Sequence, residues 1–230
     1  IWHHTMDTKR QDEPPGPTPE RDRRRWPREA QPHNEAAPSL APVLEPLFFS
    51  TLELAPQDQF AAWQTHMAPL VEVRLPDDKS LDDGFPANHT AWNLGGMLIA
   101  QQHATAHSYM RSAAKLRSSA IDHWYIALPR TGRSWTEVDR RVAENQPGKL
   151  EIRSLGYPFR GRTTESESLF LYLPRDLFAD ATTTLDAKNN SILSGNFANL
   201  LLDYLNSIEA RLRSLTADDL PRIVHATRSM

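Results

Sequence analysis

The chain has 230 residues, a formal net charge of −3 and no cysteine. The absence of cysteine excludes a disulfide framework, a thiolate metal site and a cysteine nucleophile. No apolar run approaches the roughly 18 residues of a membrane span, and the opening "IWHHTMDTKR" lacks the apolar centre of a signal peptide. We therefore expect a cytoplasmic protein without a membrane segment.

Residues 1–46 are predicted to form a disordered, proline-rich arm. This stretch holds 9 of the 18 prolines, and its 7 Lys and Arg residues nearly balance its 8 Asp and Glu residues. Such a composition cannot bury enough apolar surface to form a core. Residues 47–230 carry 19 basic and 21 acidic side chains. That balance offers no electrostatic footprint for DNA phosphates, so this portion alone should bind DNA poorly.

After the arm, the sequence predicts a short strand at 45–54 and a helix that begins at Pro56 and ends at Pro69. Proline suits the first turn of a helix and interrupts one elsewhere. A half-buried strand is predicted at 70–76, where Val71, Val73 and Leu75 alternate with charged residues.

From there to about residue 173 the pattern is mostly β. Eight or nine short strands are broken by turn residues at intervals of roughly 8–12 residues, which is typical of a barrel or jelly roll. The segment "MRSAAKLRSSAI" fits either a helical turn or a loop, and "SWTEVDRR" is taken as one strand. The stretch "SLFLYLP" is apolar on both strand faces, so it should be a central strand.

A short helix is predicted at 174–180, and a polar connection leads to a long amphipathic helix over 194–215. Its apolar residues recur at spacings of three, four and seven, which leaves one stripe that must be covered. The stripe could pack on its own sheet, pair with a second subunit, or do both. The residues proposed for dimerisation are Leu201, Tyr204, Leu205, Ile208 and Leu212. A final helix, capped by Thr216, Asp218 or Asp219, should follow.

The candidate ligand-binding residues are aromatic or charged side chains on predicted strands: Trp92, His123, Trp124, Tyr125 and Arg160. Trp124 and Tyr125 are adjacent, so one of the two rings must face the barrel interior, where it would either line a pocket or fill the core. An arginine directed into a barrel would imply an acidic ligand.

No metal site, cofactor site or catalytic site is predicted. On a single strand the α-carbons of His103 and His107 would be roughly 13 Å apart, too far for the side chains to share an ion, and only a helix or a bend would bring them together. The sequence has no GxSxG elbow, no glycine-rich phosphate loop and no HExxH helix. We therefore expect a protein that is not an enzyme.

The stretch "NQPGKLEIRSLGYPFRG" resembles the second motif of the cupin barrel, in which a Pro-Gly turn, a strand and a proline-containing bend recur. Phe159 stands where metal-dependent cupins have a histidine, and the paired His-x-His of the first motif is absent. The metal chemistry of that superfamily is therefore not expected.

Taken in order, "DQFAAWQTHMAPLVEVRL", "TAWNLGGMLIAQQ", "KLRSSAIDHWYIALPRTGRSW", "LFLYLPRDLF" and "LSGNFANLLLDYLNSI" resemble the N-terminal regulatory domain of AraC/XylS-type transcription regulators. The resemblance implies an α+β fold, with a cupin-like β-barrel or jelly roll at 47–190 and two C-terminal dimerisation or linker helices at 191–230.

By the same resemblance, the domain senses a small effector, forms a homodimer and precedes a DNA-binding domain of two helix-turn-helix units, which would begin beyond Met230. The alternatives are a dimerisation module that senses nothing and a cupin-type metal enzyme.

Overall fold

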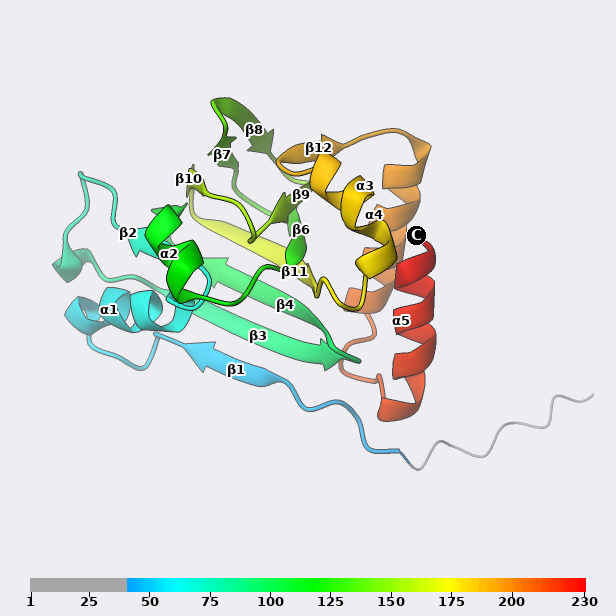
Figure 1. Cartoon of the computed structure of the whole chain (residues 1–230). Helices are drawn as coiled ribbons and strands as arrows, with labels where there is room; N and C mark the ends of the chain where they lie inside the picture. The colour runs from blue at the N-terminus through cyan, green and yellow to red at the C-terminus, as the bar shows by residue number, and fades with distance from the viewer. Residues whose placement is uncertain (1–40) are drawn as a thin grey trace, which may run out of the picture. The chain divides into compact units, whose positions relative to one another are not determined.

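Twelve antiparallel strands in residues 41–230, the part of the chain that the computed structural model describes, form two facing sheets (Figure 1). The seven-stranded sheet has the order β1 (Leu47–Ser50), β3 (Ala87–Leu94), β4 (Met97–Ala104), β11 (Ser166–Leu173), β6 (Trp124–Pro129), β9 (Leu150–Ser154), β12 (Ser191–Leu193). The five-stranded sheet has the order β2 (Glu72–Arg74), β5 (His107–Arg111), β10 (Phe159–Thr163), β7 (Ser134–Val138), β8 (Arg141–Asn145).

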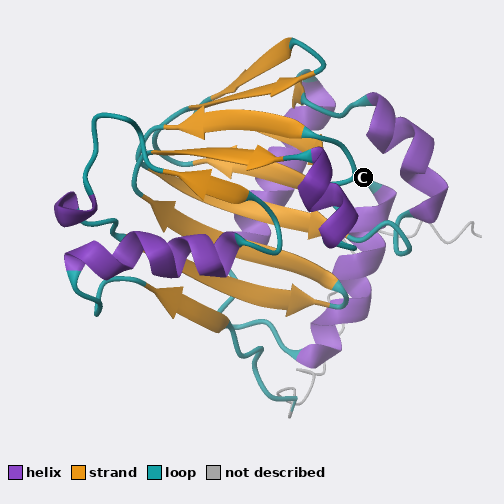
Figure 2. Cartoon of the chain, turned by 60° about the vertical axis from the view of Figure 1, so that its left-hand side comes forward, coloured by secondary structure: helices purple, strands orange, loops and turns teal. Residues whose placement is uncertain are grey.

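The described helices are α1 (Pro56–Met67), α2 (Ala113–Ser118), α3 (Thr182–Ala187), α4 (Asn196–Glu209) and α5 (Leu220–Ser229). Short 3₁₀ turns occur at Leu81–Asp83, Ala179–Ala181 and Ala217–Asp219. Helices α1 and α2 lie at one side of the strands, and α3, α4 and α5 gather at the other (Figures 1 and 2). Most of the arm predicted at 1–46 lies outside the described residues.

Strand β11 is central, as predicted, with three strands on each side of it. Leu169 and Leu171 pack among the residues that α4 and α5 cover, whereas Tyr172, on the opposite face, belongs to the cluster between the two sheets. The seven-stranded sheet is therefore buried on both faces, and this explains the continuous apolar run in the sequence. The expected cupin-like barrel followed by C-terminal helices is confirmed.

Two local predictions were wrong. The helix expected at 174–180 is a turn, and α3 forms further along at 182–187. The strand expected at 134–141 is the first part of a hairpin, because Asp139 and Arg140 adopt positive φ angles of 49° and 63° and reverse the chain between β7 and β8. Two consecutive non-glycine residues in that conformation are uncommon, so the turn carried no clear sequence signal.

One buried arginine ties together three segments of the barrel. Arg111, at the end of β5, is fully buried and donates hydrogen bonds to the carbonyl oxygens of Leu155 (2.5 Å), Leu70 (2.6 Å) and Ile121 (2.5 Å). A buried cation is costly unless its donors are satisfied, and these three carbonyls satisfy them. The arginine thereby holds three connections in fixed relative positions.

We predict that Arg111→Met lowers the free energy of unfolding by about 3–5 kcal/mol, because three buried carbonyl groups lose their donor. Urea denaturation followed by circular dichroism measures the change. The matched control is Arg117→Met on the exposed surface of α2, which should change stability by less than about 0.5 kcal/mol. Equal stabilities for the two variants would show that Arg111 does not perform this role.

Candidate functional site

The interior of the barrel holds a cavity of only about 80 Å³. Its walls combine apolar side chains such as Met67, Val71 and Phe170 with polar ones that include Gln102, His107, Asn145, Glu151 and Arg153. Sites for small organic ligands usually measure about 300–1,000 Å³. The interior as it stands has room for a few water molecules, and it has no room for an effector of ordinary size.

An ion pair occupies the space that a ligand would need. Arg153 pairs with Glu151, and its guanidinium also donates to the Tyr125 hydroxyl (2.5 Å) and the Thr136 hydroxyl (2.5 Å). The side chains of Arg153 and Glu151 are 4% and 1% exposed. The ring of Phe159 lies 5.0 Å from the Arg153 guanidinium carbon. Burial also raises the pKa of the Tyr125 phenol, so this group is a neutral hydrogen-bonding partner.

The five residues predicted to bind an effector lie on different surfaces. Tyr125 faces the interior, but Trp92 and Trp124 are buried against the C-terminal helices. The Trp124 indole donates to Asp186 (2.8 Å). His123 precedes β6 on a partly exposed connection, and Arg160 lies on the outer face of the five-stranded sheet. The fold therefore does not bring the five together.

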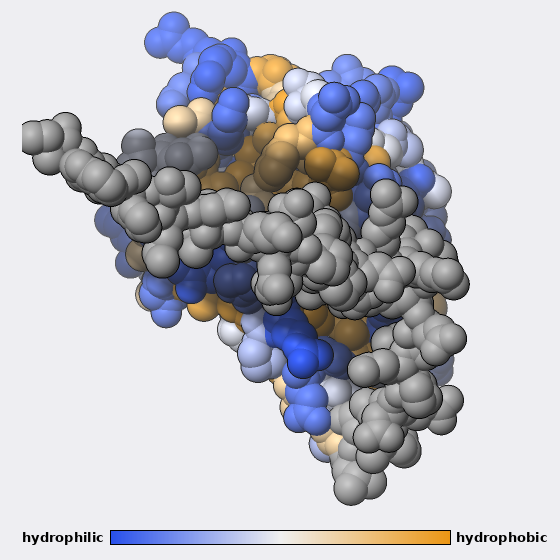
Figure 3. Space-filling view, turned by 90° about the vertical axis from the view of Figure 1, so that its right-hand side faces the viewer, coloured by the Kyte–Doolittle hydropathy of each residue, from blue (hydrophilic) through white to orange (hydrophobic). Residues whose placement is uncertain are grey.

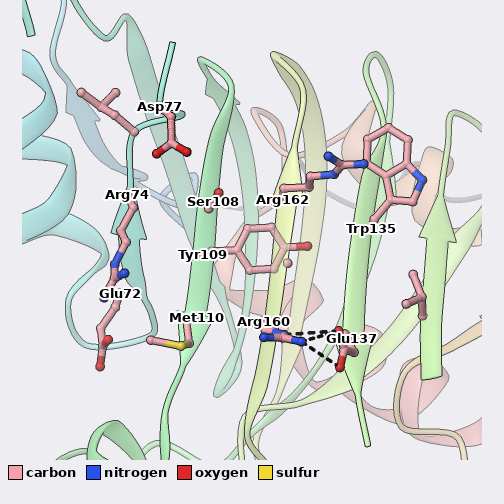
Figure 4. A pocket seen from close by; sticks show the side chains of 13 residues that line it. Glu72, Arg74, Asp77, Ser108, Tyr109, Met110, Trp135, Glu137, Arg160 and Arg162 are labelled. Atoms are coloured by element: carbon pink, nitrogen blue, oxygen red, sulfur yellow. Dashed lines mark hydrogen bonds and ion pairs between the residues drawn. The ribbon is translucent and has the colours of Figure 1, made fainter. Parts of the chain in front are cut away.

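A larger groove, of about 620 Å³, opens on the outer face of the five-stranded sheet (Figure 4). The strand registers generate it. Ser108, Arg162 and Trp135 lie side by side across β5, β10 and β7, and Arg74 on β2 continues this row. A second row consists of Glu72, Met110, Arg160, Glu137 and Val142. Alternate residues of the same strands, such as Tyr109 and Thr136, point inward.

The arginines of this groove differ in their partners. Arg160 makes a forked ion pair with Glu137, with a shortest distance of 2.9 Å (Figure 4). The guanidinium of Arg162 lies over the Trp135 ring, 5.0 Å from its centroid. Within residues 41–230, no carboxylate forms an ion pair with Arg162 or Arg74. The first row therefore offers one exposed cation, Arg162, beside an aromatic surface, and a second, Arg74, at the far end of the row. On the other side of Trp135 the row ends at Glu144, which pairs with Arg133.

Such an arrangement suits an anion that carries a flat ring system. An unpaired guanidinium can bind a carboxylate or phosphate through two parallel hydrogen bonds. A tryptophan and a guanidinium also provide planar surfaces on which a ring can stack. Of these residues, only Arg160 was identified from the sequence. The alternation in "PFRGRTT" places Arg162 on the same face as Arg160, but the position of Trp135 beside it depends on a strand pairing that the sequence does not reveal.

Comparison with known proteins identifies the family. The chain is 52% identical to a protein described as the AraC-like transcriptional activator CuxR, with a TM-score of 0.76, over 80% of this chain and 68% of that one. The chain belongs to the AraC-like transcription regulators. No family model and no curated protein matches it.

Two more distant solved structures also resemble this AraC-like chain. One is a protein of unknown function from Rhizobium leguminosarum bv. viciae 3841, with 18% identity, a TM-score of 0.30 and coverage of 37% of this chain and 81% of that one. The other is Rru_A2000 from Rhodospirillum rubrum, a cupin-2 domain, with 10% identity, a TM-score of 0.26 and coverage of 61% and 86%.

The structure also places the residues that were predicted to form the dimer contact of this regulator. Leu201, Leu205 and Leu212 are buried in the chain's own core. The Tyr204 hydroxyl lies 2.8 Å from that of Thr227 in α5, and Ile208 is partly buried. Three of the five residues therefore contact the same chain in its core, while Tyr204 and Ile208 remain partly exposed.

Hydrophobic surface remains on the side of the molecule that carries α4 and α5 (Figure 3). Phe197 and Leu200 of α4 are 57% and 58% exposed. Beside them, α3, α4 and the end of α5 line an apolar groove of about 610 Å³.

In the part of the chain that the structure describes, no three His, Asp or Glu side chains are grouped so that they could hold a metal ion. His103, on β4, instead hydrogen-bonds Glu165 (3.1 Å) on the surface, and His107 is buried on β5, which belongs to the other sheet. No helix among the described residues is long and apolar enough to cross a membrane.

His107 generates a prediction about pH. Burial lowers the pKa of this imidazole to about 4, although its Nδ1 donates to the Thr105 carbonyl (2.7 Å). In the unfolded chain the same group titrates near its ordinary value of 6.5. The unfolded state therefore binds a proton that the folded state does not, and stability falls as the pH decreases from about 6.5 to about 4.

We expect His107→Gln to reduce this acid-induced loss by about 2–3 kcal/mol, measured by urea denaturation at pH 7.5 and pH 4.5. The comparison between the two pH values separates the titration from any change in packing. His225→Gln, at an exposed position of α5, serves as the control and should leave the loss unchanged. A His107→Gln variant with the same pH dependence as the parent would contradict the prediction.

Proposed function

We propose that this chain is the effector-sensing regulatory region of an AraC-like transcription regulator, and that its effector is an anion with a flat ring system bound on the outer face of the five-stranded sheet. The observation that carries the proposal is the pairing of Arg162 with Trp135 in an open groove, where Arg162 has no carboxylate partner among the described residues. The small size of the interior cavity supports the same conclusion.

The residues of the groove suggest a division of labour. Arg162 and Arg74 would bind the negative charge, and Trp135 would stack against the ring. Arg160, which is held by Glu137, would present a fixed edge of donors and acceptors to the rest of the ligand. Because all these side chains are on strands, the site requires little rearrangement, and its geometry is set before the ligand arrives.

A contact between the barrel and α4 gives the effector a route to the C-terminal helices. The turn at 130–133 leads directly into β7, which carries Trp135. Arg130 in this turn forms an ion pair with Glu209, the last residue of α4, and Gln101 also donates to Glu209 (2.9 Å). A carboxylate at the C-terminal end of a helix is unfavourable, because that end of the helix dipole is negative. We therefore propose that the role of Glu209 is its contact with Arg130 and Gln101, and not the stability of α4.

We propose that binding at Trp135 shifts this turn and thereby the end of α4. The regulator would act as a homodimer on DNA, through the helix-turn-helix domain that the family implies, and CuxR, its relative, is described as a transcriptional activator. The effector would bind one position of α4 relative to the barrel more tightly than the other, and it would thereby shift the equilibrium between the two positions.

The test is a fluorescence titration of the chain with a panel of nucleotides, sugar phosphates and aromatic carboxylates. We expect at least one anion with a ring system to quench tryptophan emission saturably. Arg162→Gln should weaken its binding by about tenfold to a hundredfold, because one charged hydrogen-bonding partner is lost. Lys149→Gln, on an exposed turn outside the groove, is the matched control and should bind normally.

Two outcomes of the titration would count against the proposal. A ligand whose affinity is unaffected by Arg162→Gln and by Arg74→Gln does not use the groove. If no member of the panel binds, the alternative of a domain that senses nothing becomes the better account.

A further inference from the structure

The free edge of the seven-stranded sheet is unusually apolar. Of the eleven large hydrophobic side chains that are exposed within residues 41–230, five fall between positions 43 and 54. Leu47 and Phe48 of β1 are 77% and 69% exposed. These five are Val43, Leu47, Phe48, Leu52 and Leu54. We call this surface the β1 edge.

The other sheet edges are protected in ways that the β1 edge is not. Strand β2 carries Glu72 and Arg74, and β8 carries Arg141 and Glu144. Strand β12 is half-buried throughout. Charges and coverage of this kind keep sheet edges from pairing with other chains. Strand β1 has no charged residue, and among the described elements none lies beyond it (Figure 1).

The backbone of β1 also has hydrogen-bonding groups to offer. Thr51 donates its backbone N–H to the Ala87 carbonyl (2.9 Å), which identifies a hydrogen-bonded pair in the β1–β3 ladder. Because such pairs alternate along antiparallel strands, the peptide groups of Leu47 and Phe49 face β3. Those of Phe48 and Ser50 point away from the sheet.

A second copy of the same strand matches this pattern. If two β1 strands run antiparallel with Phe48 opposite Phe48, each Phe48 both donates to and accepts from its counterpart. Each Ser50 N–H then meets the carbonyl of Pro46, and the absent N–H of that proline costs only one bond on each side. Glu45, the nearest carboxylate on the N-terminal side, faces Thr51 in this register, so no two carboxylates meet.

The exposed apolar area of the β1 edge can be compared with the area that a specific protein–protein interface buries. Five large side chains with exposures of 41–77% present on the order of 500 Å² of apolar surface. Leu47 and Phe48 point to opposite faces of the sheet. Leu52 and Leu54 lie in the turn after β1, and Val43 forms a bridge with Thr216. The roughly 1,000 Å² that two copies present together is therefore an upper limit on what they can bury, and it reaches the lower bound for a specific interface. We propose that the β1 edge binds a second copy of this chain, joining two seven-stranded sheets into one across a two-fold axis. This inference rests on the homodimer of the proposed function, for which it names the contact surface, and it does not depend on the proposed effector site.

Sedimentation velocity of the full chain across a concentration series tests the proposal. We expect a monomer–dimer equilibrium in the parent, and a monomer at every concentration for Phe48→Glu, because two carboxylates would then face each other. The matched control is Leu200→Glu, which places the same charge at a leucine on α4 that is 58% exposed, against 69% for Phe48. It should retain the dimer, and circular dichroism should show that both variants are folded.

Three results would overturn the proposal. The first is a parent that stays monomeric at every concentration. The second is a dimer that survives Phe48→Glu, and the third is a dimer that Leu200→Glu dissociates while Phe48→Glu does not. A variant that lacks residues 1–40 tests whether the N-terminal arm, and not a second copy, binds the β1 edge. If it dimerises and the full chain does not, the N-terminal arm covers the β1 edge. Unlike the effector titration, these measurements require no ligand.

Discussion

The Arg153 guanidinium and the Glu151 carboxylate form an ion pair inside the barrel, where both side chains are almost completely removed from water. Such a pair is costly to bury, and it is tolerated only when the remaining donors and acceptors are satisfied. Tyr125 and Thr136 supply additional hydrogen bonds to the two terminal nitrogens of the guanidinium. The buried Nε of Arg153 has no hydrogen-bond partner among the described residues. The resulting network is tied to strands of both sheets, so the interior is held in one arrangement and cannot easily be emptied to accept a ligand.

In the function that we propose, this constraint places effector binding outside the barrel. Inward-facing and outward-facing residues alternate along β5, β10 and β7, so the strands that contribute Tyr109 and Thr136 to the interior also carry Ser108, Arg162 and Trp135 on the outer face. The pairing of β10 with β7 sets the separation of the Arg162 and Trp135 backbones in the outer groove. The turn between β6 and β7 connects this groove to α4 through Arg130 and Glu209.

Much of the fold could be predicted from the sequence, because the signals were local. Alternating residues marked the strands, Pro56 marked the start of α1, and the apolar run around Leu171 marked the central strand. The Asp139–Arg140 hairpin was missed because its backbone conformation is unusual for those residues.

The candidate site was harder to predict because it depends on which strands pair. Arg160 was noted as a single residue, but two other residues of the groove, Trp135 and Arg74, lie 25 and 86 positions before it in the chain. The amphipathic pattern of α4 was evident in the sequence, yet periodicity alone could not decide whether Leu201 and Leu205 contact the same chain or another one. In the structure they contact the same chain.

The central claim is that the effector binds outside the barrel, and fluorine NMR of the chain labelled with 5-fluorotryptophan tests it most directly. Among the described tryptophans, Trp135 lies in the groove, whereas Trp63, Trp92 and Trp124 are buried elsewhere. When the anion that binds best is added, the account predicts that the Trp135 resonance, assigned with Trp135→Phe, shifts most. A large shift of the Trp124 or Trp63 resonance with no change at Trp135 would contradict it.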